Sequence, residues 1–170
     1  VILLDALTSS WAWRYHPEQL EAAVDAAASV ATLAIEAGHQ VGLVTNGTPL
    51  ATGRPILRPA AGLRQLELIM HSLARVQPML SQPLGDLFDT HAAALLPNAD
   101  ACTLIYITGK EDEDANGLLA RLCAKGAVGC CIYVGAGAPP DTGTVPLYDY
   151  SEVLGFASRQ EVEQAKVLHA

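Results

Sequence analysis

A single carboxylate, Asp5, follows the first apolar run of the chain, residues 1–4, and a hydroxyl-rich stretch, Thr8-Ser9-Ser10, comes soon after it. The apolar run predicts a buried strand, and a second run at 41–45 predicts another. In open α/β sheets the loops diverge at the carboxyl ends of the strands and leave a crevice in which ligands bind. Asp5, Thr8 and Ser9 are therefore candidate ligands for a hard cation such as Mg²⁺, which prefers oxygen ligands.

Polar residues also follow two other predicted strands, at what should be the same edge of the sheet. Asn46 follows the second strand, and Thr108 and Lys110 follow a third apolar run at 102–107. Residues 111–114 are all acidic, and they fit a solvated first turn of a helix, where carboxylates favour the positive end of the helix dipole. One of them, Asp112, is a further candidate metal ligand.

An aromatic and basic cluster lies in the loop after Asp5. Trp11, Trp13 and Arg14 belong to residue types that are enriched among the anchors of protein interfaces. The two tryptophans would equally serve as a lid over the mouth of the sheet, and the sequence favours neither alternative. We expect partner contact at the rim formed by residues 5–14, 45–47 and 108–112.

The elements that must position these residues alternate between strands and helices. A helix should begin at Pro17 and end at Gly38, with an apolar stripe that includes Ala27, Ala31 and Ile35. After a turn at 46–49 we expect an antiparallel edge strand at 54–59 and a helix at 63–77. The residues expected to face inward on that helix are Leu63, Leu66, Met70 and Leu73. A short helix near 86–96 should follow, then strands at 102–107 and 128–134 with a helix between them from the acidic residues to Gly126. A last edge strand is expected at 145–148, and the capping box at 158–161 should open a final helix. This order predicts an α/β fold: an open, mostly parallel, Rossmann-type sheet of about six strands, with helices on both faces and one antiparallel edge strand.

Composition narrows the function classes. The 170 residues fit one domain, hydrophobic residues make up 51%, and no run approaches eighteen apolar residues, so no membrane span is expected. A formal net charge of -8 without a basic cluster opposes binding to nucleic acid. The chain begins inside a strand, which we interpret as a fragment of a larger protein whose localisation these residues do not specify.

The four cysteines and five histidines form no metal-binding pattern. None of the cysteines makes a CxxC or Cys/His pair with zinc-ligand spacing, so all four are expected as reduced thiols. Cys130 and Cys131 should point to opposite faces of one strand.

Three stretches of the chain resemble a bacterial family known as domain of unknown function fifty-eight. They are LEAAVDAAASVATLAIEAGHQVGLVTNG at 20–47, LELIMHSLARVQP at 66–78 and LLPNADACTLIYITG at 95–109, in the order and at the approximate separation found in that family. The resemblance covers about the first two thirds of the chain and rests on packing residues. It implies a von Willebrand factor A-like domain, usually encoded beside MoxR-type AAA+ ATPases, and a soluble domain of a membrane-associated bacterial protein.

The chain departs from the metal site that this resemblance implies. The usual motif is DxSxS, whereas this chain has Asp5-Ala6-Leu7-Thr8-Ser9, so only Asp5 and Ser9 match. Where the related fold commonly has threonine-aspartate-glycine after the central strand, residues 108–110 read Thr-Gly-Lys, which removes an anion and introduces a cation. The resemblance thus implies a degenerate metal-ion-dependent adhesion site, with weak Mg²⁺ binding by Asp5, Ser9 and Asp112 as the metal hypothesis.

We therefore expect a protein-interaction or scaffold module that works with a MoxR-type ATPase, without catalytic or cofactor-binding residues. The expected partner-binding residues are Trp11, Trp13, Arg14, Asn46, Thr108 and Lys110. The sequence contains no phosphate-binding GxxxxGK loop and no GxSxG nucleophile elbow.

The alternative is a Mg²⁺-dependent phosphoryl-transfer hydrolase of the haloacid dehalogenase type that uses Asp5 as nucleophile. Asp5 to Thr8 and Thr45-Asn46 resemble the DxDxT and threonine motifs of those enzymes. Leu7, however, stands where the second aspartate should transfer a proton.

Overall fold

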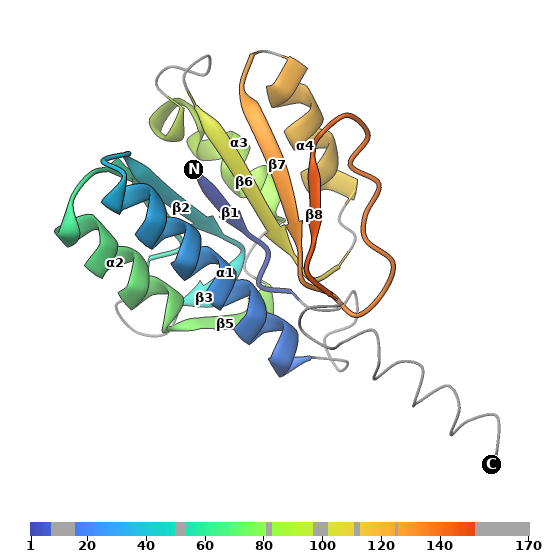
Figure 1. Ribbon diagram of the computed structural model, residues 1–170, viewed down its shortest axis with the longest axis horizontal. Coiled ribbons are helices and arrows are strands. Elements are labelled where there is room, and N and C mark those ends of the chain that lie inside the picture. The colour runs from blue at the N-terminus through green and yellow to red at the C-terminus, as the bar shows by residue number, and fades with distance from the viewer. Residues whose placement is uncertain are drawn as a thin grey trace.

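One mixed sheet organises the computed structural model, which describes residues 1–7, 16–49, 54–80, 83–96, 102–110, 113–124 and 126–151. The sheet has six strands in the order β4-β2-β1-β6-β7-β8 (Figure 1). Their bounds are β1 Ile2–Leu4, β2 Val41–Thr45, β4 Ile56–Ala60, β6 Thr103–Thr108, β7 Val128–Tyr133 and β8 Leu147–Asp149. The expected α/β, Rossmann-like open sheet is confirmed.

Strand β1 lies at the centre and pairs in parallel with β2 on one side and β6 on the other. Strands β7 and β8 continue the parallel part of the sheet beyond β6. Strand β4 pairs antiparallel with β2 and forms the edge. The predicted antiparallel edge strand is therefore confirmed, and its Pro59 stands where proline is tolerated in a sheet.

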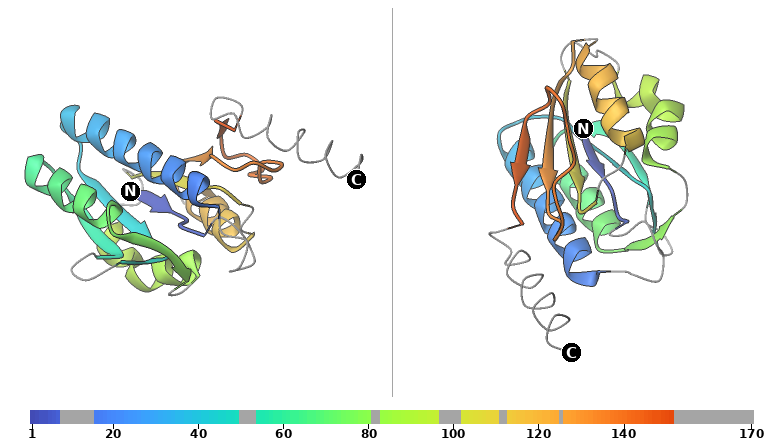
Figure 2. Two further views of the ribbon diagram at one scale, coloured as in Figure 1. Left: turned by 90° about the horizontal axis from the view of Figure 1, so that it is seen from below. Right: turned by 90° about the vertical axis from the view of Figure 1, so that its right-hand side faces the viewer.

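Helices cover both faces of this sheet (Figure 2). On one face α1 (Pro17–Glu36) and α2 (Leu63–Leu73) pack against Ile2, Leu4 and Leu43. On the other face α3 (Leu84–Leu95) and α4 (Glu113–Ala124) pack against Leu3, Leu104 and Tyr106. Adjacent residues of β1 enter opposite cores because side chains alternate along a strand.

The first helix follows its sequence signals. Pro17 occupies its first turn, where the missing N–H is not needed. Ala23, Ala27 and Ala31 form its buried stripe, and these small side chains let the helix approach the central strands closely. Gly38 follows the helix with φ of 84°, a left-handed conformation that glycine adopts without steric cost.

The segment between the second and third helices differs from the prediction. Helix α2 ends at Leu73 instead of Gln77, and Val76–Leu80 forms a strand, β5. β5 pairs antiparallel with β3 (Gly47–Pro49), a stretch predicted as a turn, in a second, two-stranded sheet. Pro78 disfavours helical backbone at Gln77, and the pairing of Val76 with Pro49 holds the chain extended from Val76 onward.

The inward face of α2 was predicted correctly at Leu73, which is buried, and at Leu66 and Met70, which are partly buried, but wrongly at Leu63. Leu63 is 75% exposed, while Gln65 and Ile69 are buried. The Gln65 Nε2 amide donates to the carbonyl oxygens of Val41 at 2.7 Å and Arg58 at 2.9 Å. A polar side chain thus ties α2 to the two strands at this edge of the sheet.

The remaining described elements lie close to the predicted ones. The four cysteines are free thiols, and Cys131 is buried while its neighbour Cys130 on the opposite face is only partly buried. The capping box at 158–161 lies outside the described residues. Within the described part of the chain, no helix combines the length and the apolar character needed to cross a membrane.

Replacing Gln65 with alanine should lower the free energy of unfolding by about 1–3 kcal/mol, because the buried Val41 carbonyl and the partly buried Arg58 carbonyl lose their donor. Chemical denaturation of the variant and the unchanged protein measures the difference. Glu67→Ala, at an exposed position of the same helix, is the control and should change stability by less than about 0.5 kcal/mol. Equal effects of the two substitutions would contradict this role of Gln65.

Candidate functional site

The candidate site lies at the carboxyl end of the central strand. Asp5 directly follows β1, and its backbone N–H donates to the Ile107 carbonyl of β6 at 2.9 Å. Strand β2, which follows β1 in the chain, lies on one side of β1, and β6 lies on the other side. The order in which strands are added to the sheet therefore reverses at β1. Ligand sites of open α/β sheets form at such a switch point, outside the carboxyl ends of the strands.

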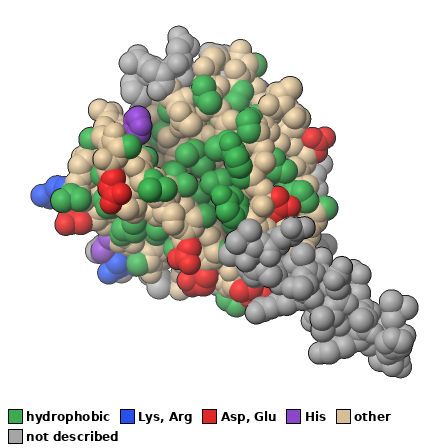
Figure 3. Space-filling view, viewed as in Figure 1, with side chains coloured by type: hydrophobic (Ala, Val, Ile, Leu, Met, Phe, Trp, Pro, Cys, Tyr) green, Lys and Arg blue, Asp and Glu red, His purple; other side chains and the backbone are tan. Residues whose placement is uncertain are grey.

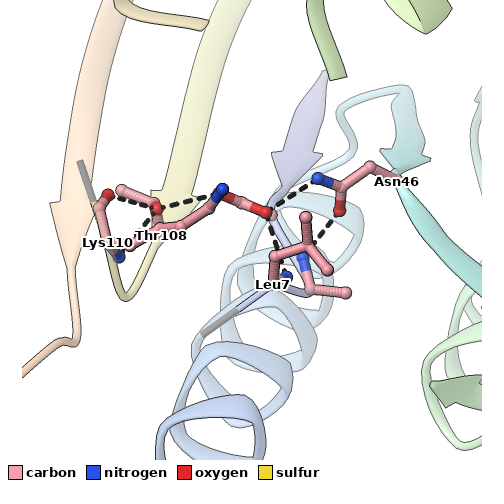
Figure 4. Close-up of polar contacts among 6 residues, drawn as sticks. Leu7, Asn46, Thr108 and Lys110 are labelled. Atoms are coloured by element: carbon pink, nitrogen blue, oxygen red, sulfur yellow. Dashed lines mark hydrogen bonds and ion pairs between the residues drawn. The ribbon is translucent and has the colours of Figure 1, made fainter. Parts of the chain in front are cut away.

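Both oxygens of the Asp5 carboxylate have protein partners. Its Oδ1 accepts hydrogen bonds from Asn46 Nδ2 at 2.8 Å and from the Leu7 N–H at 3.0 Å. Its Oδ2 lies 3.2 Å from the Thr108 hydroxyl and 3.8 Å from the Lys110 ammonium. Figure 4 shows Leu7 and Asn46 on one side of this carboxylate and Thr108 and Lys110 on the other.

Asn46 connects the side chain of Asp5 with the backbone after it. While its Nδ2 donates to the carboxylate, its Oδ1 accepts the N–H of Ala6 at 2.8 Å. Asn46 is buried at the end of β2, next to Thr45, whose hydroxyl accepts the Gly47 N–H at 3.2 Å. The amide therefore fixes the tip of β1 against β2.

Thr108 links the same carboxylate to the end of β6. Its hydroxyl accepts the Lys110 N–H at 3.1 Å and has two candidate acceptors, the Lys110 carbonyl at 2.7 Å and Asp5 Oδ2 at 3.2 Å. A hydroxyl carries one proton, so it donates to only one of them at a time. The shorter distance favours donation to the carbonyl, and the Lys110 ammonium then supplies a positive charge next to Oδ2.

Charge compensation explains why this arrangement is stable. The Asp5 side chain is 0% exposed and that of Lys110 is 18% exposed. A carboxylate removed from water is costly unless it is paired and hydrogen-bonded. Two N–H donors and one ammonium meet that requirement here.

Close backbone contacts hold the surrounding loops in place. A Cβ atom at Gly47 would lie 2.7 Å from the Ala6 Cβ and 2.7 Å from the Gln77 carbonyl oxygen, so β3 and β5 leave room only for glycine. A Cβ atom at Gly135 would collide with the Gly109 carbonyl oxygen and the Tyr133 hydroxyl. The loops that follow β1, β6 and β7 are thus packed against their neighbours.

The structure brings together four of the residues chosen from the sequence: Asp5, Asn46, Thr108 and Lys110. The other chosen residues, Thr8, Ser9, Trp11, Trp13, Arg14 and Asp112, lie outside the described residues. Sequence analysis missed the backbone N–H groups of Ala6 and Leu7. The hydrogen bond from Leu7 to Asp5 is a local turn of the kind that aspartate often forms with the residue two positions later.

The described donors do not fit a Mg²⁺ site. Among the described residues, no three His, Cys, Asp or Glu side chains come together to hold a metal ion. The Asp5 carboxylate faces an amide nitrogen, a backbone N–H and an ammonium, and the Thr108 hydroxyl is the one described side-chain oxygen near it, which is too few for the oxygen ligands that Mg²⁺ requires. A metal at Oδ2 would have to displace Lys110.

The chain was compared with protein-family models, with curated proteins and with solved structures, and none of them matched it.

Removing the ammonium should expose the dependence of the fold on this ion pair. We expect Lys110→Met to lower the free energy of unfolding by roughly 2–4 kcal/mol, because Asp5 keeps its buried charge without a counter-ion. Adding Asp5→Asn to Lys110→Met should recover part of that loss, and urea denaturation of the two single variants and the double variant measures the coupling.

The matched control is Arg121→Met, which breaks an exposed ion pair with Asp89 at 3.5 Å. Exposed pairs contribute about 0–1 kcal/mol, so this variant should be nearly as stable as the unchanged protein. If Lys110→Met costs no more than Arg121→Met, the Asp5–Lys110 pair does not stabilise the fold in this way.

Proposed function

We propose that this chain is a non-catalytic protein-interaction domain, in which a lysine takes the place that a metal ion would occupy at the tip of the central strand. One observation carries the proposal: Lys110 supplies the positive charge next to the buried Asp5 carboxylate. A carboxylate that binds a metal must offer an oxygen to it, whereas both Asp5 oxygens already have partners. Asp5, Asn46, Thr108 and Lys110 then link the ends of β1, β2 and β6 to one another.

These contacts support an interaction role, because they fix the strand ends from which the loops of the rim start. Asp5, Asn46 and Thr108 each end or follow a central strand, and each is buried. Loops that project from a rigid sheet edge commonly carry binding residues. In this proposal Trp11, Trp13 and Arg14 supply the contact surface, with Asn46, Thr108 and Lys110 beneath or beside it.

The proposed partner is a MoxR-type AAA+ ATPase. This choice comes from the resemblance to the bacterial family of domain of unknown function fifty-eight and its von Willebrand factor A-like fold. An open sheet with one antiparallel edge strand agrees with that resemblance.

The phosphoryl-transfer hydrolase is the second candidate, and one observation favours it. Lys110 and Asn46 both contact Asp5, and enzymes of the haloacid dehalogenase type place a lysine near the nucleophilic aspartate. Two features oppose it: the Asp5 side chain is completely buried, and Leu7 contributes a backbone N–H where a second carboxylate is needed for proton transfer.

Titration with Mg²⁺ and with Mn²⁺ and a generic phosphatase assay separate the two candidates. We expect no saturable heat of binding that depends on Asp5, and no phosphate release above that of the Asp5→Ala variant. Asp89→Ala, which removes an exposed carboxylate, controls for non-specific ion binding. Turnover or saturable metal binding that disappears only in Asp5→Ala would overturn the non-catalytic proposal.

The contact surface is tested by capture of a purified MoxR-type ATPase on the immobilised chain. Trp11→Ala/Trp13→Ala should weaken the apparent Kd at least about tenfold, which corresponds to 1.4 kcal/mol. The double variant Leu63→Ala/Leu68→Ala removes two exposed apolar side chains from α2 and should bind normally. Unchanged capture by the tryptophan variant would remove the interface hypothesis.

A further inference from the structure

One half of the sheet has an apolar face that no described helix covers. In the register of the parallel strands, Ile105 of β6 pairs with Cys130 of β7, and Ile132 of β7 pairs with Tyr148 of β8. Paired residues of a parallel sheet point to the same side, and Ile105 and Ile132 pack against the core on the side of α1. The apolar side chains of these three strands that point to this side and are not fully buried form a surface that we name the open face: Ile105, Val128, Cys130, Ile132 and Tyr148.

Exposure distinguishes the open face from the opposite side of the same strands. Val128 is 66% exposed and Tyr148 is 54% exposed, whereas Leu104 and Tyr106, which lie beneath α3 and α4, are 0% exposed. Figure 1 shows α1 and α2 over the β4-β2-β1 half of the sheet, and Figure 3 shows apolar side chains gathered at the centre of the same side of the molecule. Parallel sheets are normally covered by helices on both faces. The open face therefore has the character of a surface to which a helix binds.

Helix α1 forms one wall of the open face. Its residues Val30 and Ala34 and Ile105 of β6 line a common groove with a volume of about 580 Å³. Ala22 and Ala26 precede Val30 at intervals of four residues, so they lie on the same side of the helix, and both are partly buried. Because these side chains are small, a second helix can pack closely beside α1.

The dimensions of the open face fit one helix. Strand β7 has six residues, which span about 20 Å, and thirteen helical residues span the same length at 1.5 Å per residue. Strands β7 and β8 are neighbours, and two strands about 4.8 Å apart have a combined width of about 10 Å, which is the diameter of a helix. An amphipathic helix binds such a surface through its apolar side, while its backbone groups stay bonded within the helix.

The charges that border the open face are acidic. Glu18 lies four residues before Ala22 and Asp25 lies three residues after it, so both carboxylates lie along the wall that α1 forms. Both are exposed, and α1 contains no Lys, Arg or His. Figure 3 shows acidic side chains on either side of the apolar area, while the Lys and Arg side chains in this view lie at the left margin. Basic side chains on a partner would complement this border.

We propose that the open face binds a helix of a partner protein, about thirteen residues long, with one apolar side and with Lys or Arg along its flanks. The bound helix lies beside α1 and over β7 and β8. A second copy of this chain is a poor occupant, because a net charge of -8 and an acidic α1 on each copy would bring carboxylates together.

Two synthetic peptides test the chemistry of the partner. Each has about thirteen residues, with leucine at intervals of three and four residues, and the remaining positions are lysine in one peptide and glutamate in the other. In fluorescence anisotropy titrations with the full chain at low salt, the lysine peptide should bind with a Kd at least about tenfold below that of the glutamate peptide. Equal affinities, or no saturable binding of the lysine peptide, would overturn the proposal.

A pair of matched double variants locates the contact. Val128→Lys/Tyr148→Lys places two charges on the open face and should weaken binding of the lysine peptide at least about tenfold. Leu63→Lys/Leu68→Lys makes the same change of charge on α2 and should leave the Kd within about twofold. All four side chains are exposed, so the substitutions leave the core intact. Equal effects of the two double variants would place the peptide elsewhere and overturn the proposal.

Alkylation of Cys130 distinguishes the possible occupants. Cys130 should react with iodoacetamide in the free chain, and a saturating concentration of the lysine peptide should slow this reaction at least about tenfold, as measured by peptide mass spectrometry. Cys131, which is buried on the other side of β7 and whose pKa burial and the neighbouring Cys130 raise to about 12, should stay unreactive throughout.

Two results would overturn the proposal in favour of another cover. If Cys130 is as unreactive as Cys131 in the free chain, the open face is already covered. If the free chain sediments as a dimer that Val128→Lys/Tyr148→Lys dissociates, a second copy is the occupant. Neither result depends on the MoxR-type partner or on the Asp5–Lys110 pair.

Discussion

The burial of one carboxylate constrains this end of the molecule. Asp5 is completely buried between the ends of three strands, and such a group is stable only when donors and a positive charge surround it. Asn46 supplies a donor from β2, Leu7 supplies one from the chain after β1, and Lys110 supplies the charge from beyond β6. Each of these contacts joins Asp5 to a neighbouring strand end or loop, so the electrostatic requirement and the packing of the sheet edge are satisfied together.

The same constraint limits the chemistry of the site. Ligand sites in this fold class lie in the crevice at the switch point, and here a lysine and an asparagine amide occupy the space around the carboxylate. A nucleophile or a metal ligand needs an accessible oxygen, and Asp5 has none in this arrangement. The location that is typical of a ligand site in this fold class is therefore occupied here by a buried ion pair between Asp5 and Lys110.

The predictions from sequence succeeded where residues close in the chain determine the local structure. They failed where contacts with residues distant in the chain determine it. Pro17, the alanine stripe and Gly38 predict α1 because each acts within a few residues. The apolar runs and the polar residues after them predict which strand ends meet, because parallel strands place their carboxyl ends together. The end of α2 was wrong because β5 gains its partner, β3, from a segment nearly thirty residues earlier. Gln65 was missed because its burial depends on two carbonyls, from β2 and β4, whose positions the helical pattern does not contain.

Strand β7 shows how the apolar composition of a strand relates to the helices that cover it. A strand of a parallel sheet is stable with apolar residues on both sides only if both sides are covered, and β7 has them on both. Helices α3 and α4 cover one side, and α1 lies across β1, β2 and β6 on the other. On that second side Cys130 and Ile132 of β7 are therefore only partly buried, and Tyr148 of β8 is exposed, because no described helix lies over these two strands.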